Sequence, residues 1–236
     1  MNVELMWQSL PKLLSGLPLT LELVFLSLFF GAFLALGVAL VRLSGWRVAA
    51  AIAAAYVFVF RGTPLLVQLF LVYYGLGQFP GVRDSFLWPI LREPFWCAII
   101  AMTLNTGAYA SEIVRGGIQS VPHGQVEAAR ACGMSRFLVF RRIVLPLAIR
   151  QALPAYSNEV VLMVKASSLA STVTLLEMTG LARRLIAQTF AVYEIFILAG
   201  IIYLALNFTL TRLLKALEHA LDPMRQPPGT RSGGSF

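Results

Sequence analysis

The sequence contains an uncharged apolar run at residues 23–41, LVFLSLFFGAFLALGVALV. A helix needs about 20 mainly apolar residues to cross the hydrocarbon core of a bilayer. This run has nearly that length and brings no charge into the core. It therefore predicts a membrane-spanning helix, which restricts the whole chain to folds that a bilayer accepts.

Three other continuous segments have the composition of a span. They lie at 95–111, 195–211 and 154–176, and the last of them contains Glu159 and Lys165. Pro154 suits the first turn of that last helix, because proline is common where a helix begins. Each of the three segments is expected to cross the membrane once.

A fifth span is interrupted by the residues RGTP. Residues 48–60 and 65–77 are both apolar, but each is too short to cross alone. Pro64 biases Thr63 away from helix and marks a boundary between the two halves. We expect the first half to lie in the membrane interface and the second half to be the span.

The composition agrees with a membrane protein, since 58% of the residues are hydrophobic and only 13% are charged. A soluble globule of this composition would have too little polar surface to cover itself. The sequence thus predicts an all-α integral membrane protein with about five transmembrane helices. We expect a short periplasmic segment at 1–16, a transmembrane domain at 17–221 and a disordered cytoplasmic tail at 222–236, which is rich in Pro, Gly and Ser.

The lysines and arginines indicate the orientation, because cytoplasmic loops carry an excess of both. With the N-terminus outside, thirteen of the nineteen fall on the inner side, Arg61 among them, and five on the outer side, while Lys165 lies in a span. The expected topology is therefore multi-pass, with the C-terminus in the cytoplasm. The same rule explains the net charge of +8, so no nucleic-acid partner is expected.

The sequence offers no catalytic or metal site. Neither cysteine and neither histidine has a partner at metal-ligand spacing, and no serine, histidine and aspartate arrangement stands out. No GxxxxGK[ST] loop is present to hold nucleotide phosphates. We therefore expect a chain that is not an enzyme and that binds no cofactor itself.

The inner loop at 120–147 reads as two short helices joined by a glycine. Ser120 is a candidate cap and Pro122 suits the first turn of a helix over 122–132. Gly133 then ends this helix, because glycine takes a positive φ without strain. Ser135 is expected to cap a second helix.

The second helix, RFLVFRRIVL, is expected to stop before Pro146. A DNA-binding helix-turn-helix is an alternative for this pair, since it also places an alanine four residues before a turn glycine. The second helix, however, shows Phe137, Leu138 and Phe140 where polar base-reading side chains are needed. The apolar face instead suits a groove on a partner protein.

The loop resembles the cytoplasmic coupling loop, or EAA loop, of permease subunits of bacterial ABC importers. The matching residues are Glu127, Ala128, Ala129, Gly133, Ile143, Leu145 and Pro146. The segments RGTPLLVQ, TLNTGAYASEI and LPAYSNEVVLMVKASSLAST are similar to the polar amino acid branch, in particular to histidine and arginine importers.

This resemblance implies a type I ABC importer permease fold, a multi-pass location in the bacterial inner membrane with the N-terminus in the periplasm, and a set of partners. The partners are a homologous second permease, an ATP-binding subunit dimer and a periplasmic solute-binding protein. The histidine and arginine importers suggest that the second permease is not identical to this chain. The ATP-binding dimer would hold ATP and Mg. The coupling loop would enter a cleft of the ATPase subunit. There Arg141 and Arg142 would pair either with acids of that subunit or with lipid headgroups.

The expected cargo is a basic amino acid of the arginine, histidine, lysine and ornithine class. Glu159 is the candidate to meet its cationic side chain or amino group, and the other candidate substrate-binding residues are Asn105, Tyr109 and Ser167. Asn105 and Tyr109 are four residues apart and so share a helix face. A purely structural role for Glu159 remains open, as does a gradient-driven transporter that uses Glu22, Glu159 and Lys165.

Overall fold

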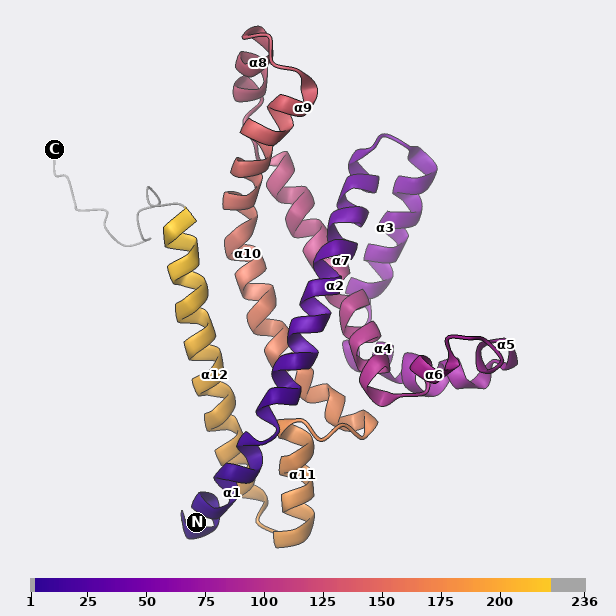
Figure 1. Cartoon of the computed structure of the whole chain (residues 1–236), viewed down its shortest axis with the longest axis vertical. Helices are drawn as coiled ribbons and strands as arrows, with labels where there is room; N and C mark the ends of the chain where they lie inside the picture. Colours follow the sequence, from indigo (N-terminus) through magenta and orange to yellow (C-terminus); the bar gives the residue numbers. More distant parts are fainter. Residues whose placement is uncertain (1–2, 222–236) are drawn as a thin grey trace, which may run out of the picture.

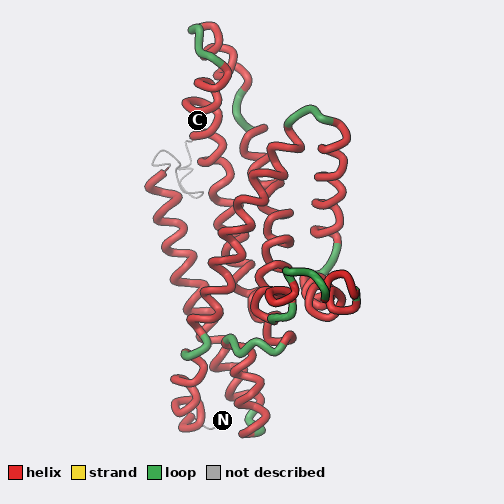
Figure 2. Tube along the Cα trace, turned by 45° about the vertical axis from the view of Figure 1, so that its right-hand side comes forward, coloured by secondary structure: helices red, strands yellow, loops and turns green. Residues whose placement is uncertain are grey.

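The computed structural model describes residues 3–221, and these residues form helices and loops without a strand (Figure 2). The long helices are α1 (Val3–Leu14), α2 (Leu17–Leu43), α3 (Arg47–Gly62), α7 (Pro94–Gln119), α10 (Leu145–Ala166), α11 (Met178–Thr189) and α12 (Val192–Leu221). The short ones are α4 (Leu65–Phe70), η1 (Leu71–Gly75), η2 (Leu76–Gln78), α5 (Pro80–Arg83), α6 (Trp88–Leu91), α8 (His123–Ala131), α9 (Arg136–Val139), η3 (Phe140–Val144) and η4 (Ser167–Val173). The predicted tail at 222–236 lies outside the described residues.

Three of these helices, α2, α7 and α12, are each long and apolar enough to cross a membrane alone. Two bent pairs add up to two more spans: Arg47–Gly62 with Leu65–Gln78, at 106°, and Arg136–Val173 with Met178–Thr189, at 49°. The expected all-helical architecture of about five spans is therefore confirmed. The predicted runs 23–41, 95–111 and 195–211 lie inside helices that extend further. The predicted run 154–176 instead covers the second half of α10, η4 and part of the loop before α11.

The centre of the bundle is the contact between α2 and α7. Gly31 of α2 meets α7 so closely that an added Cβ would collide with the side chain of Thr106. Small residues at helix interfaces let backbones approach in this way, which replaces the hydrophobic driving force that lipid cannot supply. The buried stripe of α2 accordingly consists largely of small side chains, namely Thr20, Ser27, Gly31, Ala35 and Ala39.

The expectation that 48–60 lies in the membrane interface is wrong. Helix α3 runs lengthwise beside α2 and packs on both α2 and α7 (Figure 1). Tyr56 donates a hydrogen bond to the carbonyl of Leu104 over 2.6 Å. The chain then bends at Thr63 and Pro64, both of which are extended. An apolar composition suits the bundle and the interface equally, so composition alone could not separate the two.

The expectation that a helix stops before Pro146 is also wrong. The chain stays helical from α9 through η3 into α10, and Pro146 lies in the first turn of α10. The five residues of η3 form a π-helical turn, and the amide of Leu145 donates to the carbonyl of Phe140. A wider turn of this kind relieves the clash between a proline ring and the preceding carbonyl. Pro154 likewise lies inside α10 instead of beginning it.

The two ends of the molecule are built differently. The loop of α8 and α9 forms one end, whereas α1 and α11 pack against α12 at the other (Figure 1). At the latter end, Glu177 is fully buried and caps α11 by accepting from the amides of Thr179 and Gly180, each over 2.9 Å. Tyr203 of α12 donates to the same carboxylate over 2.9 Å. Glu177 therefore joins α11 to α12.

Candidate coupling loop and substrate cavity

The glycine turn between α8 and α9 has the geometry that its sequence predicts. Gly133 has a φ of +78°, its amide donates to Arg130 over 2.9 Å, and the amide of Met134 donates to Ala129 over 3.2 Å. This pair of bonds is a Schellman motif, which satisfies carbonyls that the end of a helix leaves free. Ala129 is buried on the inner side of the turn.

One of the two predicted caps is confirmed. The hydroxyl of Ser135 accepts from the amide of Leu138 at the start of α9. Ser120, however, does not cap α8. Its hydroxyl donates to the carbonyl of Gly117 over 2.8 Å, so it belongs to the end of α7, and Pro122 occupies the capping position of α8.

The outer side of the loop is apolar and exposed. Phe137 is 72% exposed, although Val139 two residues later is buried. Glu127, Ala128, Arg141 and Pro146 are also exposed, Leu145 is 38% exposed and Ile143 is half-buried. A loop that holds a large aromatic side chain away from its own protein on a capped turn presents a docking surface.

A cavity of about 320 Å³ lies where the break after α3 meets α7 and α10. Its lining is mostly apolar, with Asn105, Tyr109 and Glu159 as candidate ligand groups. Pockets of this kind suit small molecules, since few polar groups in an apolar wall fix the orientation of a ligand. The structure thus brings together three of the four predicted substrate residues, and the complete lining is Thr63, Pro64, Leu65, Asn105, Tyr109, Glu159, Leu162, Met163, Ala166 and Leu169.

One wall of the cavity is held by an amide network. The buried Gln68 donates through Nε2 to the carbonyl of Phe60 over 2.9 Å and contacts the hydroxyl of Thr63 at 2.8 Å. Nδ2 of Asn105 donates to Oε1 of Gln68 over 3.0 Å. Gln68 thus satisfies carbonyls freed where α3 ends, a necessity in a membrane that offers them no water.

Glu159 supplies the negative charge of the cavity. Its side chain is 6% exposed, and Oε1 accepts a hydrogen bond from the hydroxyl of Thr106 over 2.9 Å. Within residues 3–221 the structure shows no hydrogen bond to the other carboxylate oxygen. A buried carboxylate with an oxygen available is suited to accept from a cationic ligand.

Arg61 places a positive charge beside the same cavity. Its guanidinium lies 5.2 Å from the ring centroid of Tyr109, and its carbonyl accepts from the Tyr109 hydroxyl over 3.3 Å. The sequence had grouped Arg61 with the inner loops. Because α3 runs along the bundle, Arg61 lies at the opposite end of that helix from Arg47.

Ser167 and the gradient-driven relay are placed elsewhere. Ser167 is fully buried, and its hydroxyl donates to the carbonyl of Val164 over 2.7 Å, away from the cavity lining. Glu22 on α2 and Lys165 on α10 are both exposed, and no ion pair joins either of them to Glu159 among the described residues. The three charges do not form a relay.

Gln68, Thr106 and Arg61 are the residues of this site that sequence reasoning missed. A signal for Gln68 was available, because a single amide in an otherwise apolar run needs a partner inside the membrane. Thr106 lies next to Asn105 in the segment TLNTGAYASEI, but its partner is 53 residues away in the chain. No local pattern indicates such a pairing.

Together, an all-helical bundle of spans, an exposed loop on a capped turn and a small apolar cavity with a few polar groups define a membrane permease that couples to a separate protein. The chain belongs to the family described as binding-protein-dependent transport system inner membrane component, which matches residues 28–223. Permeases of this family work with ATPase and binding-protein partners. Family membership removes the gradient-driven alternative.

Similar proteins include the octopine transport system permease protein of Rhizobium radiobacter, which is 56% identical over 94% of this chain and 90% of its own length. The histidine/lysine/arginine/ornithine transport system permease protein of Escherichia coli K12 is 42% identical over 86% of each chain. A crystal structure of an amino acid ABC transporter with histidines shares 34% identity, with a TM-score of 0.84 over 93% of this chain and 99% of that one. This chain is therefore a permease subunit of an ABC amino acid importer and a multi-pass inner membrane protein.

Proposed function

We propose that this permease moves a basic amino acid, or a related opine, from the periplasm to the cytoplasm. The observation that carries the proposal is Glu159, a buried carboxylate on the cavity wall with one oxygen free of hydrogen bonds within the described chain. A carboxylate and a guanidinium or ammonium group form charge-assisted hydrogen bonds, which are stronger than neutral ones. The names of the similar permeases, which transport octopine or basic amino acids, support the same class.

Arg61 supports an amino acid as the cargo. It carries the opposite charge beside the same cavity, next to Tyr109. A basic amino acid has both a carboxylate and cationic groups, so it offers a partner to each charge. Asn105 also lines the cavity, although its amide nitrogen already donates to Gln68.

In the proposed assembly, the loop at 120–147 transmits the motion of the ATPase subunits. Phe137 and the exposed residues of the EAA pattern would lie in a cleft of that partner, and ATP and Mg would be bound and hydrolysed there. A homologous, non-identical second permease, a second ATPase copy and a periplasmic binding protein complete the importer. The excess of basic residues on the loop side supports a periplasmic N-terminus and a cytoplasmic C-terminus.

The substrate class is tested with the assembled transporter in proteoliposomes that contain ATP and its binding protein. Labelled arginine, histidine, lysine, ornithine, octopine and nopaline are compared with glutamate and glutamine. The proposal predicts ATP-dependent uptake of at least one cationic substrate and none of glutamate. A transporter that prefers glutamate or glutamine would contradict the substrate assignment.

A further inference from the structure

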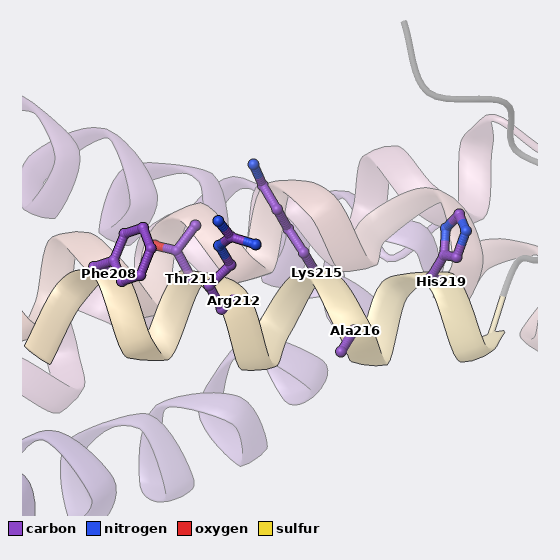
Figure 3. Close-up of a pocket in the computed structure, with 6 residues that line it drawn as sticks. All are labelled: Phe208, Thr211, Arg212, Lys215, Ala216 and His219. Atoms are coloured by element: carbon purple, nitrogen blue, oxygen red, sulfur yellow. The ribbon is translucent and has the colours of Figure 1, made fainter.

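A second hollow, of about 640 Å³, lies on the C-terminal half of α12 and is unrelated to the substrate cavity (Figure 3). Its lining is Phe208, Thr211, Arg212, Lys215, Ala216 and His219. Successive members of this set are one to four residues apart, so they form one stripe along the helix. Three of the six are basic side chains.

The position of the stripe along α12 is set by hydropathy. The apolar run 195–211 spans roughly 25 Å at 1.5 Å per residue, close to the thickness of the hydrocarbon core. Arg212 is the first charge after this run, and Lys215 and His219 follow about 4.5 and 10 Å further along the axis. With the orientation proposed above, on which this inference rests, the basic stripe begins at the headgroup level of the inner leaflet.

Arg212 and Lys215 form no ion pair within residues 3–221. The acid Glu218 follows Lys215 by three residues, is half-buried, and lines with Lys215 a separate hollow between α12 and α10. The Arg212 guanidinium lies 5.0 Å from the ring centroid of Phe208, which is one turn deeper in the membrane and 60% exposed. An aromatic ring at the acyl boundary below two cations matches a ligand with an anionic head and an apolar tail.

The opposite face of the same helix is different. Leu213, Leu217 and Leu221 are exposed there, and their mean direction is about 170° around the helix from that of the basic residues, at 100° per residue. The rule that keeps positive residues on the inner side favours no particular face of a helix. Their restriction to one face that also contains a hollow requires a more specific explanation.

We propose that this stripe binds the phosphate headgroup of an anionic phospholipid of the inner leaflet, with an acyl chain along Phe208. Arg212 and Lys215 contact the phosphate, and His219 extends the site toward the cytoplasm. Basic pockets on the cytoplasmic side of transmembrane helices suit such headgroups, because the anionic leaflet attracts juxtamembrane cations. The site gives the last helix a fixed position in the membrane that is independent of substrate.

Lipid retention by the assembled transporter tests this inference without any transport measurement. The purified complex is stripped of lipid, incubated with an equal mixture of phosphatidylglycerol and phosphatidylethanolamine, and analysed by native mass spectrometry. Arg212→Gln combined with Lys215→Gln is expected to lower phosphatidylglycerol retention several-fold and to leave phosphatidylethanolamine unchanged. The matched control, Arg47→Gln with Arg150→Gln, removes two exposed charges outside the hollow and should retain both lipids as the wild type does.

Equal retention of phosphatidylglycerol in all three proteins would overturn the proposal. The proposal would also be overturned if millimolar inorganic phosphate displaced phosphatidylglycerol from the wild type, because the site would then hold a free anion. Loss of the ATPase subunit with lipid retention unchanged would assign the stripe to a protein partner instead. If the double Gln variant does not assemble, Arg212→Lys with Lys215→Arg keeps the charge and must retain the lipid, and failure to do so in an assembled complex contradicts the proposal.

Discussion

The hydroxyl of Thr106 donates to Oε1 of Glu159 over 2.9 Å and so connects α7 to α10 in the interior of the bundle. Replacing Thr106 with valine keeps the branched shape and removes this donor. A hydrogen bond to a charged group contributes about 1.5–3 kcal/mol to stability, and a buried group left without its partner costs a similar amount. We expect Thr106→Val to lower the Tm of the purified complex, as measured by thermal unfolding in detergent.

Thr106→Ser is the control for that experiment, because it keeps the hydroxyl and loses only the methyl group that lies near Gly31. Serine should keep most of the Tm. If serine lowers Tm and valine does not, the methyl contact of Thr106 with α2 matters and the hydrogen bond to Glu159 does not.

Gly133 allows a sharp test of coupling. Its φ is +78°, and an added Cβ would meet no atom within 4 Å, so the effect of a larger residue is purely conformational. A β-branched residue in this region costs about 1–3 kcal/mol. We expect Gly133→Val to deform the turn, reduce transport and make ATP hydrolysis insensitive to the binding protein.

Gly124 is the matched control, because it lies in α8 with equally open surroundings but without a positive φ. Gly124→Val should leave the coupling between the binding protein and ATP hydrolysis close to that of the wild type. Normal coupling in the Gly133 variant would show that the turn is not critical.

Phe137 tests the docking surface. At 72% exposure its side chain adds little to the packing of the permease itself, so truncation should not destabilise the fold. We expect Phe137→Ala to lower the amount of ATPase subunit that co-purifies with the permease in detergent. Phe190→Ala, which changes an 87% exposed phenylalanine at the other end of the molecule, should retain the ATPase subunit. Equal retention in both variants would argue against a docking role for Phe137.

Local chemistry explains which features the sequence could predict. The turn at Gly133 and the cap at Ser135 depend on neighbouring residues in the chain, so residue type alone predicts them. The charge-free run at 23–41 depends on the bilayer, so its hydropathy alone predicts a span. Pro146 was misjudged because the rule for proline assumes an α-helical turn, and the π-helical turn at Phe140–Val144 removes the clash.

The substrate cavity was predictable only in part. The spacing of Asn105 and Tyr109 indicated one helix face, and the charge of Glu159 indicated a function inside the membrane. Tertiary packing brings Asn105, Tyr109 and Glu159 next to the break after α3. It also brings together Gln68 and Asn105, which are 37 residues apart in the chain. Neither arrangement follows from a local sequence pattern. Arg61 was assigned to the wrong place because composition does not show which way an apolar segment runs.

The role of Glu159 in substrate binding is tested most directly by the uptake of basic substrates by the Glu159→Gln variant. Glutamine keeps the size of the side chain and its bond to Thr106 but removes the charge that a cationic substrate would meet. Initial rates are measured over a range of concentrations in ATP-loaded proteoliposomes, with Glu22→Gln as a control that removes the same charge from an exposed site on α2. We expect KM to rise about tenfold or more for the best cationic substrate, with assembly and basal ATP hydrolysis intact. Unchanged uptake kinetics in a correctly assembled Glu159→Gln transporter would contradict it.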